Sequence, residues 1–196
     1  MFARTQVRNA LARYFQDPGA RFLHTLRLTP NAVTLLGLAM SLAAASLAAA
    51  EWLLASGLLL LVASAMDMLD GALARLSGKE SPRGALLDSV SDRLAEAAVL
   101  MGLFILYLRT GSDRDAVLAF MVLVASFMVS YLRARGEGLG ITMRETGLFT
   151  RTERVVVLVL GLLTNLIIPA LAIVLALSTY TFSQRLYHLW RYTRNE

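Results

Sequence analysis

Four aspartates stand close together in an otherwise apolar part of this chain: Asp67-Met-Leu-Asp70-Gly71-Ala72-Leu73-Ala74-Arg75 and, after eight further residues, Gly84-Ala-Leu-Leu-Asp88-Ser-Val-Ser-Asp92. A carboxylate inside an apolar membrane segment is costly, and it persists only where it has a partner or a task. The first two aspartates are three residues apart and the last two are four apart, so each pair falls on one face of a helix. Two such helices facing each other would gather four oxygen ligands, as a hard divalent cation such as Mg²⁺ requires. The stretch therefore predicts a metal-dependent enzyme embedded in a membrane.

The composition agrees with a membrane location. The chain has 196 residues, of which 57% are hydrophobic and 17% charged, and its mean hydropathy is +0.59. It contains no cysteine, which excludes a disulfide framework and thiol chemistry. The formal net charge is +5. In so apolar a chain we assign the basic residues to anionic lipid and to membrane topology, and we expect no nucleic-acid partner.

Six apolar stretches, each near the roughly 20 residues that a spanning helix needs, predict an all-α integral membrane protein with six transmembrane helices. We place them at about 31–50, 52–75, 84–108, 115–135, 153–168 and 170–190, with a tight turn at Pro169 between the last two. These helices form one domain, residues 29–196.

Residues 1–28 precede that domain as a juxtamembrane segment. Ala3, Val7 and Leu11 recur at helical spacing with arginines on another face, until Asp17-Pro18-Gly19 breaks the pattern. This spacing predicts an interfacial amphipathic helix that lies on the bilayer. A solvated basic arm is the alternative.

The basic residues predict the orientation of the spans. With the N-terminus in the cytoplasm, 16 of the 19 lysines and arginines fall on one side of the membrane. The positive-inside rule makes that side cytoplasmic, so both termini would lie on the cytoplasmic side of the cell membrane. The connection between the second and third spans is short, which predicts that these two helices are antiparallel neighbours. Their aspartates would then line a cavity that is open to the cytoplasm.

The aspartates belong to a longer pattern, Asp-x2-Asp-Gly-x2-Ala-Arg-x8-Gly-x3-Asp-x3-Asp, which residues 67–92 fit without a gap. This pattern resembles the signature of the CDP-alcohol phosphotransferase family, membrane enzymes that make phospholipids. It fixes eight residue types at fixed offsets, which makes it far more specific than a short glycine motif. The resemblance extends to Thr29-Pro30-Asn31-Ala-Val-Thr34, which is similar to the segment that faces the nucleotide in this family.

The resemblance implies a chemistry for each aspartate. A CDP-linked lipid carries a diphosphate whose charge must be neutralised before a hydroxyl group can attack phosphorus, and one or two Mg²⁺ or Mn²⁺ ions serve this purpose. The implied metal ligands are Asp67, Asp70, Asp88 and Asp92. Asp92 is also the implied base that takes the proton of the alcohol.

Eight further residues are implied to bind the CDP-linked lipid: Asn31, Ala32, Val33, Thr34, Gly71, Ala74, Arg75 and Ser81. Gly71 and Ala74 have small side chains that would let the nucleotide approach the helix closely. Arg75 and Ser81 would donate hydrogen bonds to the nucleotide or its phosphates. Simple helix packing remains an alternative for Gly71 and Ala74, and a helix-starting role remains one for Ser81. Glu96, one turn beyond Asp92, is expected to pair with Arg93 or with another span.

Three later segments bear on the acceptor: residues 129–137, 150–154 and 183–190. All three resemble the bacterial phosphatidylinositol phosphate synthase branch of the family. That branch uses inositol phosphate, a dianion that demands a basic pocket, and the matching residues are Arg133, Arg154 and Arg185. Arg135 and Arg151 could serve topology alone. The alternative within the family is a phosphatidylglycerophosphate synthase or an enzyme with another acceptor.

The resemblance further implies CDP-diacylglycerol as the donor, with an ether-lipid donor left open, and a homodimer in the membrane. A cation transporter could use the same carboxylates. Transporter sites lie near the bilayer midplane between internal repeats and broken helices, whereas here the acids lie toward one end of their spans and no repeat is visible. A purely structural membrane protein would leave the four aspartates unexplained.

The orientation can be tested directly. Reporter domains fused to either terminus should be cytoplasmic, because the basic residues partition to that side. A periplasmic or extracellular reporter signal at either end would overturn both the topology and the cytoplasmic placement of the aspartates.

Overall fold

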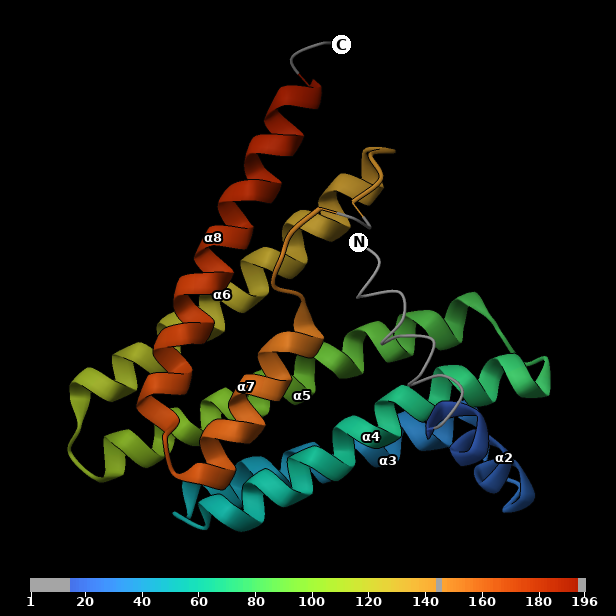
Figure 1. Cartoon of the computed structure of the whole chain (residues 1–196), viewed down its shortest axis with the longest axis horizontal. Coiled ribbons are helices and arrows are strands. Elements are labelled where there is room, and N and C mark those ends of the chain that lie inside the picture. The colour runs from blue at the N-terminus through green and yellow to red at the C-terminus, as the bar shows by residue number, and fades with distance from the viewer. Residues whose placement is uncertain (1–14, 144–145, 194–196) are drawn as a thin grey trace. The chain divides into compact units, whose positions relative to one another are not determined.

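The computed structural model describes residues 15–143 and 146–193, and these are helical apart from their connections. Figure 1 shows the course of the chain. The elements are α2 (Asp17–Thr25), α3 (Pro30–Ala49), α4 (Leu53–Ser77), α5 (Pro82–Arg109), α6 (Asp113–Gly138), α7 (Arg151–Thr164) and α8 (Ile167–Thr193). The helices α3–α8 match the six predicted apolar stretches in order, and the predicted ends differ from those observed by a few residues.

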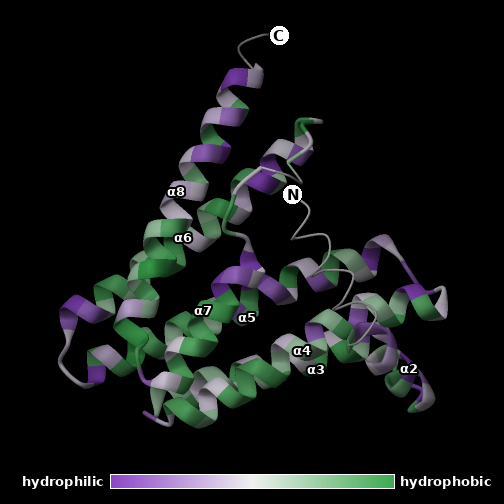
Figure 2. Ribbon diagram, in the orientation of Figure 1, coloured by the Kyte–Doolittle hydropathy of each residue, from purple (hydrophilic) through white to green (hydrophobic). Residues whose placement is uncertain are grey.

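Four of the described helices, α3, α4, α6 and α8, are long and apolar enough to cross a membrane. Figure 2 shows the apolar character along α4 and along the first half of α8, which becomes polar toward its C-terminal end. The predicted all-α membrane fold is thus confirmed at the level of four candidate spans. The other two helices differ for separate reasons. α7 has only 14 residues, fewer than the roughly 20 that a span needs, and α5 is long but carries the charged residues of the aspartate stretch.

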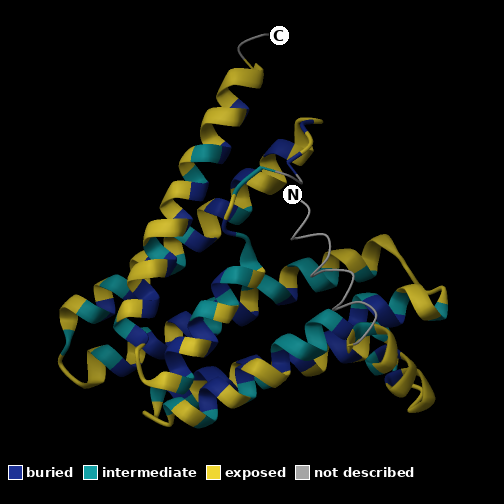
Figure 3. Ribbon diagram, viewed as in Figure 1, coloured by how far each residue is buried: buried dark blue, intermediate teal, exposed yellow. Residues whose placement is uncertain are grey.

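The apolar helices expose much of their apolar surface. On α6 the exposed large side chains include Val117, Phe120, Val124 and Phe127, which recur at helical spacing along one face. Figure 3 shows that this exposure alternates with buried positions along the helices. Such a face suits a lipid environment, where apolar side chains outside the core incur no cost.

The predicted turn at Pro169 is wrong. The chain turns at Asn165, which adopts the left-handed conformation with φ 57°, and the N–H of the next residue, Leu166, donates to the Gly161 carbonyl at 2.9 Å. Pro169 lies in the first turn of α8. The first N–H groups of a helix have no partner within the helix, so proline is tolerated there.

An element boundary coincides with the break predicted at Asp17-Pro18-Gly19. α2 begins at Asp17, and Pro18 occupies its first turn. One side of α2 is buried through Ala20 and Leu23, while Phe22 is 65% exposed. The predicted amphipathic helix falls largely on residues 1–14, which lie outside the described residues.

The chain forms two compact units, a first unit of residues 1–42 and 59–95 and a second unit of residues 43–58 and 96–196. The core of the first unit joins α2, α3 and α4 through Ala20, Leu23, Val33, Leu69, Ala72 and Leu73. Gly19 permits the close approach of α2, since a Cβ atom at this position would lie 2.6 Å from a methyl group of Leu69.

In the second unit α8 packs against both α6 and α7. The segment that follows α6 folds back onto α6 and α8, where Ile141 and Met143 form a buried cluster with Leu132 and Leu189. Gly136 makes room for this cluster, because a Cβ atom there would lie 2.5 Å from Met143 Cγ.

Candidate active site

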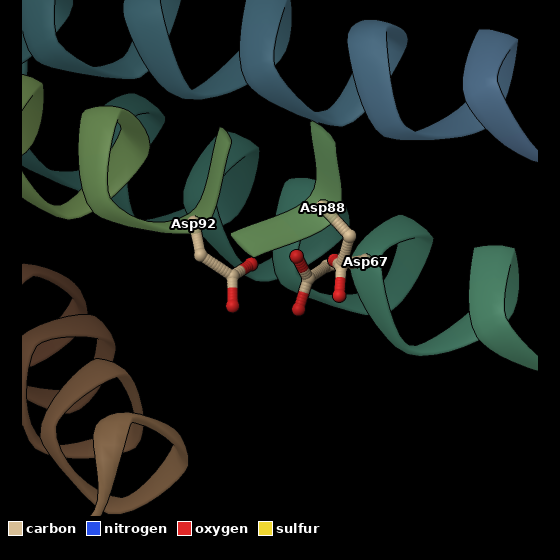
Figure 4. A group of neighbouring side chains, drawn as sticks. All are labelled: Asp67, Asp88 and Asp92. Atoms are coloured by element: carbon tan, nitrogen blue, oxygen red, sulfur yellow. The ribbon is translucent and has the colours of Figure 1, made fainter. Parts of the chain in front are cut away.

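Three of the four aspartates lie together in the first unit. Asp67 on α4 and Asp88 and Asp92 on α5 each offer a carboxylate oxygen, and these oxygens all lie within 4.8 Å of one another. Figure 4 shows the three carboxyl groups extending to the same side of their helices. All three are half-buried. Anionic oxygens gathered this closely repel one another unless a cation or a proton reduces their charge, so the donor set fits a hard divalent cation.

The local sequence explains how α4 and α5 present these residues. The connection between them is only four residues, 78–81, in which Gly78 adopts a left-handed φ of 62°. Ser81 then starts α5, since its hydroxyl accepts a hydrogen bond from the Gly84 N–H at 3.1 Å. A serine at this position satisfies one of the N–H groups that the first turn leaves without a partner. The predicted pairing of the two helices through a short connection is confirmed.

Asp70 has a separate environment from the other three aspartates. It is buried, and its Oδ2 accepts a hydrogen bond from the Thr34 hydroxyl on α3 at 2.6 Å. Asp70 still lies near enough to Asp67 and Asp88 to interact with their charges. The structure thus brings three of the four predicted ligands into one cluster and places the fourth beside it, tied to α3. A metal-binding role for Asp70 stays a prediction.

A cleft opens beside the carboxylates in the first unit, and its empty space, counted together with the open solvent at its mouth, is about 580 Å³. Asp70 and Asp88 form part of its wall, so the cleft is continuous with the charged cluster. Its other lining residues come from the start of α3, the end of α4, the connection 78–81 and the start of α5: Pro30, Asn31, Thr34, Gly71, Ala74, Arg75, Lys79, Glu80, Ser81, Gly84 and Ala85.

Six of the eight residues predicted to bind the CDP-linked lipid line this cleft, and two do not. Val33 is 1% exposed and packs in the core of the first unit, because it follows Asn31 by two positions and faces the opposite side of α3. Ala32 lies at the exposed start of α3, where its N–H donates to the Thr29 hydroxyl. The helical period, which separates neighbours by about 100°, explains why four consecutive residues cannot all face one cleft.

Lys79 and Glu80 also line the cleft, although neither was among the predicted binding residues. Both are exposed in the connection between α4 and α5. Their position between two motif segments was the available signal, because a loop that joins two site helices borders the site. Lys79 adds a second cation to Arg75 at the rim, which favours an anionic ligand.

The three predicted acceptor arginines all lie in the second unit. Arg133 on α6 is exposed and pairs with Glu137 at 3.0 Å. Arg185 on α8 is buried, and it lies near enough to Arg133 and Arg154 to interact with both charges. The structure therefore gathers the three cations, which come from three different helices.

Arg154 is not a free cation, contrary to what its predicted role would suggest. Its Nε and Nη2 donate to the two carboxylate oxygens of Glu96 at 2.6 and 2.9 Å. The exposed fractions of the two side chains are 1% and 4%. Removing one partner of such a buried pair costs about 3–5 kcal/mol, because the other charge is left without compensation. The expected pairing of Glu96 is confirmed, and its partner lies on another helix.

The position of Arg154 follows from the local sequence of α7. Thr150 and Glu153 form a capping box, in which the Thr150 N–H donates to the Glu153 carboxylate at 2.9 Å. This motif fixes the start of the helix, and Arg154 follows within the first turn, on the buried side.

Comparison with known proteins identifies the family. Residues 27–186 match the family model of the CDP-alcohol phosphatidyltransferases. The chain belongs to this family. It is 37% identical over 165 residues to the archaetidylinositol phosphate synthase of Pyrococcus horikoshii, and the aligned region covers 84% of this chain and 85% of that protein.

A solved structure of this family is also similar. The phosphatidylinositol phosphate synthase of Mycobacterium tuberculosis with CDP-DAG bound superposes with a TM-score of 0.81 and 30% identity, covering 89% of this chain and 93% of that one. A second structure of that enzyme, in complex with manganese and citrate, has a TM-score of 0.81 and 31% identity, covering 89% and 88%. The predicted family and the predicted enzyme class are thereby confirmed. The predicted cofactor, Mg²⁺ or Mn²⁺, is supported by that manganese complex and fits the carboxylate cluster described above.

The carboxylate cluster makes a prediction about metal affinity. Asp67→Asn in the purified phosphatidyltransferase should weaken Mn²⁺ binding by at least about tenfold, because it removes one of three charged oxygen ligands. Electron paramagnetic resonance titration without substrate measures this affinity. Asp113→Asn is a matched control, since this exposed carboxylate at the start of α6 lies outside the cluster. Equal Mn²⁺ affinity in both variants would contradict the assignment of the metal to this cluster.

Proposed function

We propose that this phosphatidyltransferase transfers the lipid phosphate group of a CDP-linked lipid to inositol phosphate, releasing CMP and forming phosphatidylinositol phosphate or its ether-lipid equivalent. The observation that carries the choice of acceptor is the gathering of Arg133, Arg154 and Arg185 in one unit. The related enzymes also support it. The names of the archaeal and the mycobacterial relatives share inositol phosphate and differ in the lipid.

The donor side of the proposal rests on the cleft of the first unit. Arg75 and Lys79 at its rim would neutralise the diphosphate, with the planar guanidinium of Arg75 suited to two oxygens at once. Gly71 contributes no side chain to the wall, and the nearest atom to a Cβ added there is Arg75 Nη1 at 3.6 Å. The open space beside Gly71 supports a close approach of the nucleotide to α4.

The reaction is a displacement at phosphorus. A hydroxyl oxygen of the acceptor attacks the phosphorus that carries the lipid, its proton passes to the Asp92 carboxylate, and the bond from this phosphorus to the CMP oxygen breaks. When bound, the divalent cation supplies positive charge that neutralises the diphosphate and the departing CMP. Asp67 and Asp88 would hold it together with Asp92. Asp70, fixed by Thr34, would complete the acidic set on the donor side.

The acceptor side of the proposal rests on charge. A phosphate monoester carries nearly two negative charges at neutral pH. Glu96 compensates Arg154, and Glu137 faces Arg133 in solvent, so Arg185 is the buried cation whose hydrogen bonds to described residues go to neutral carbonyl groups. A phosphorylated acceptor would supply its counter-charge, which a neutral polyol could not do.

We further infer that all six helices α3–α8 cross the membrane, that both termini and the site are cytoplasmic, and that the enzyme acts as a homodimer. The basic residues at the end of α8 support six crossings. If the short α7 did not cross, α8 would carry Arg185 and Arg191 to the opposite side, against the positive-inside rule. The charged residues of α5 would be tolerated because they lie in its first half, where they form the site. The dimer rests on the family resemblance alone, and the mass of the detergent-solubilised enzyme by light scattering tests it.

The proposed base makes a prediction about turnover. Asp92→Asn should lower kcat by at least about a hundredfold, because general-base catalysis contributes on the order of 10²–10⁴. Its affinity for CDP-diacylglycerol should change much less, since the donor cleft is left intact. CMP release at saturating Mg²⁺ measures turnover, and the donor affinity is measured separately by binding. Near-wild-type kcat would refute the role of Asp92.

The acceptor is tested with a panel of alcohols and CDP-diacylglycerol. Inositol 1-phosphate should exceed free inositol by a large factor in kcat/KM, because only the phosphorylated form compensates the arginines. A preference for glycerol 3-phosphate would make this chain a phosphatidylglycerophosphate synthase, with the same fold and mechanism.

Arg133 offers the sharpest variant for this test. It is exposed, and its pair with Glu137 contributes little to stability, whereas removing Arg154 would leave Glu96 buried without a partner. Arg133→Ala should therefore raise the KM for inositol 1-phosphate by about tenfold or more, as expected when a charged hydrogen bond worth about 1.5–3 kcal/mol is lost. Arg135→Ala on the same exposed turn is the matched control. The same KM in both variants would contradict the proposed acceptor site.

A further inference from the structure

Arg185 is held by backbone groups from two segments of the second unit. Its Nη1 donates to the Val129 carbonyl of α6 at 2.7 Å, and its Nε donates to the Thr146 carbonyl at 3.0 Å. The side chain is buried, with 4% of the residue exposed. The orientation of this guanidinium therefore depends on where the chain around Thr146 lies.

The chain around Thr146 lies close to α8 because residue 147 is glycine. Gly147 has a φ of 109°, a conformation that side chains rarely adopt. A Cβ atom at this position would lie 2.7 Å from Thr181 Cγ2 and 3.0 Å from Arg185 Nε. Any larger residue would push this segment away from α8, and the Thr146 carbonyl would move with it.

A second contact fixes the same segment from the other side. The Phe149 N–H donates to the Thr181 hydroxyl at 3.2 Å. Thr181 is fully buried and Phe149 is nearly so. Thr181 lies on α8 one turn before Arg185, so one face of α8 holds both the segment and the arginine that the segment orients.

We propose that Gly147 and Thr181 are positioning residues for the acceptor site, which act by fixing the guanidinium of Arg185. The inference rests on the proposed function, in which Arg185 binds the phosphate of the acceptor. A free arginine side chain would lose its rotamer freedom on binding, and carbonyl groups that hold it beforehand remove that cost. They also set the direction of its remaining N–H groups, on which the geometry of a charged hydrogen bond to phosphate depends.

A set of glycine variants separates this role from a general effect on folding. Gly147→Ala should raise the KM for inositol 1-phosphate by about tenfold or more, because misplacing a binding group by about 1 Å can cost up to about a hundredfold. The KM for CDP-diacylglycerol should stay within about twofold, since the donor cleft is formed by other residues.

Two neighbouring glycines provide matched controls. Gly140 also has a positive φ, 76°, but a Cβ atom there would have no atom within 4 Å, so Gly140→Ala strains the backbone without contacting Arg185. Gly138→Ala adds a methyl group in open space without that strain. Thermal unfolding in detergent should show a larger loss of stability for Gly147→Ala than for Gly140→Ala, because only the first substitution adds close contacts to the backbone strain. An acceptor KM for Gly147→Ala that equals that of Gly140→Ala, or an equal rise in the donor KM, would overturn the proposal.

Variants of Thr181 decide the question if Gly147→Ala does not fold. Thr181→Val keeps the shape but removes the oxygen that accepts from Phe149, and it should raise the acceptor KM alone. Thr181→Ser keeps that oxygen and should raise this KM less. Where Gly147→Ala folds, adding Thr181→Ser should restore part of the acceptor affinity, because it deletes the Cγ2 atom nearest to the added methyl group. An unchanged acceptor KM in Thr181→Val would overturn the proposal.

The wild-type enzyme distinguishes failure of this inference from failure of the proposed function. If the wild-type enzyme uses glycerol 3-phosphate and not inositol 1-phosphate, the inositol assignment fails. The roles of Gly147 and Thr181 are then tested by comparing the KM for glycerol 3-phosphate among the same variants. If wild type prefers a neutral acceptor, both the function and the inference are overturned.

Discussion

The repulsion among carboxylates that share a small apolar space is the constraint on which the rest of the site depends. Asp67, Asp88 and Asp92 stand within 4.8 Å of one another on two helices. Such a cluster is costly in an apolar segment without a cation. The residues around it must therefore allow a ligand to bind as well as pack the helices. The four-residue connection between α4 and α5 meets this demand, because it keeps the two helices paired and forms one wall of the adjacent cleft.

Burial also demands a partner for three other charged groups among the described residues. Asp70 receives a hydrogen bond from Thr34, and Arg154 is matched by both oxygens of Glu96. Arg185 is satisfied by carbonyl groups of α6 and of the segment before α7. In each case the partner lies on an element distant in the sequence, so these contacts also fix one helix against another. These three charged groups thus contribute both to helix packing and to the proposed binding sites, because leaving a buried charged group without a partner is costly.

Local sequence signals predicted the elements well and their boundaries less well. Each of the six predicted apolar stretches corresponds to a helix, and in the four candidate spans a helix satisfies every backbone group within the segment. The two prolines that marked predicted boundaries, Pro18 and Pro169, both lie in first turns of helices. Proline is disfavoured in the interior of a helix but tolerated in its first turn. A proline in the sequence therefore marks a helix boundary without showing whether the helix precedes or follows it.

The carboxylate pairs, their placement on facing helices and the family were predictable without a structure, because spacing along a helix and a fixed motif are local properties. The partner of each charged residue was not predictable in this way and became known from the packing of the helices. Asp70 accepts a hydrogen bond from Thr34 and lies beside the cluster, and Val33 packs in the core of the first unit. Arg154 forms an ion pair with a glutamate 58 positions away in the sequence. Such pairings depend on how helices rotate and slide against one another as they pack. No periodicity within a single helix records that rotation.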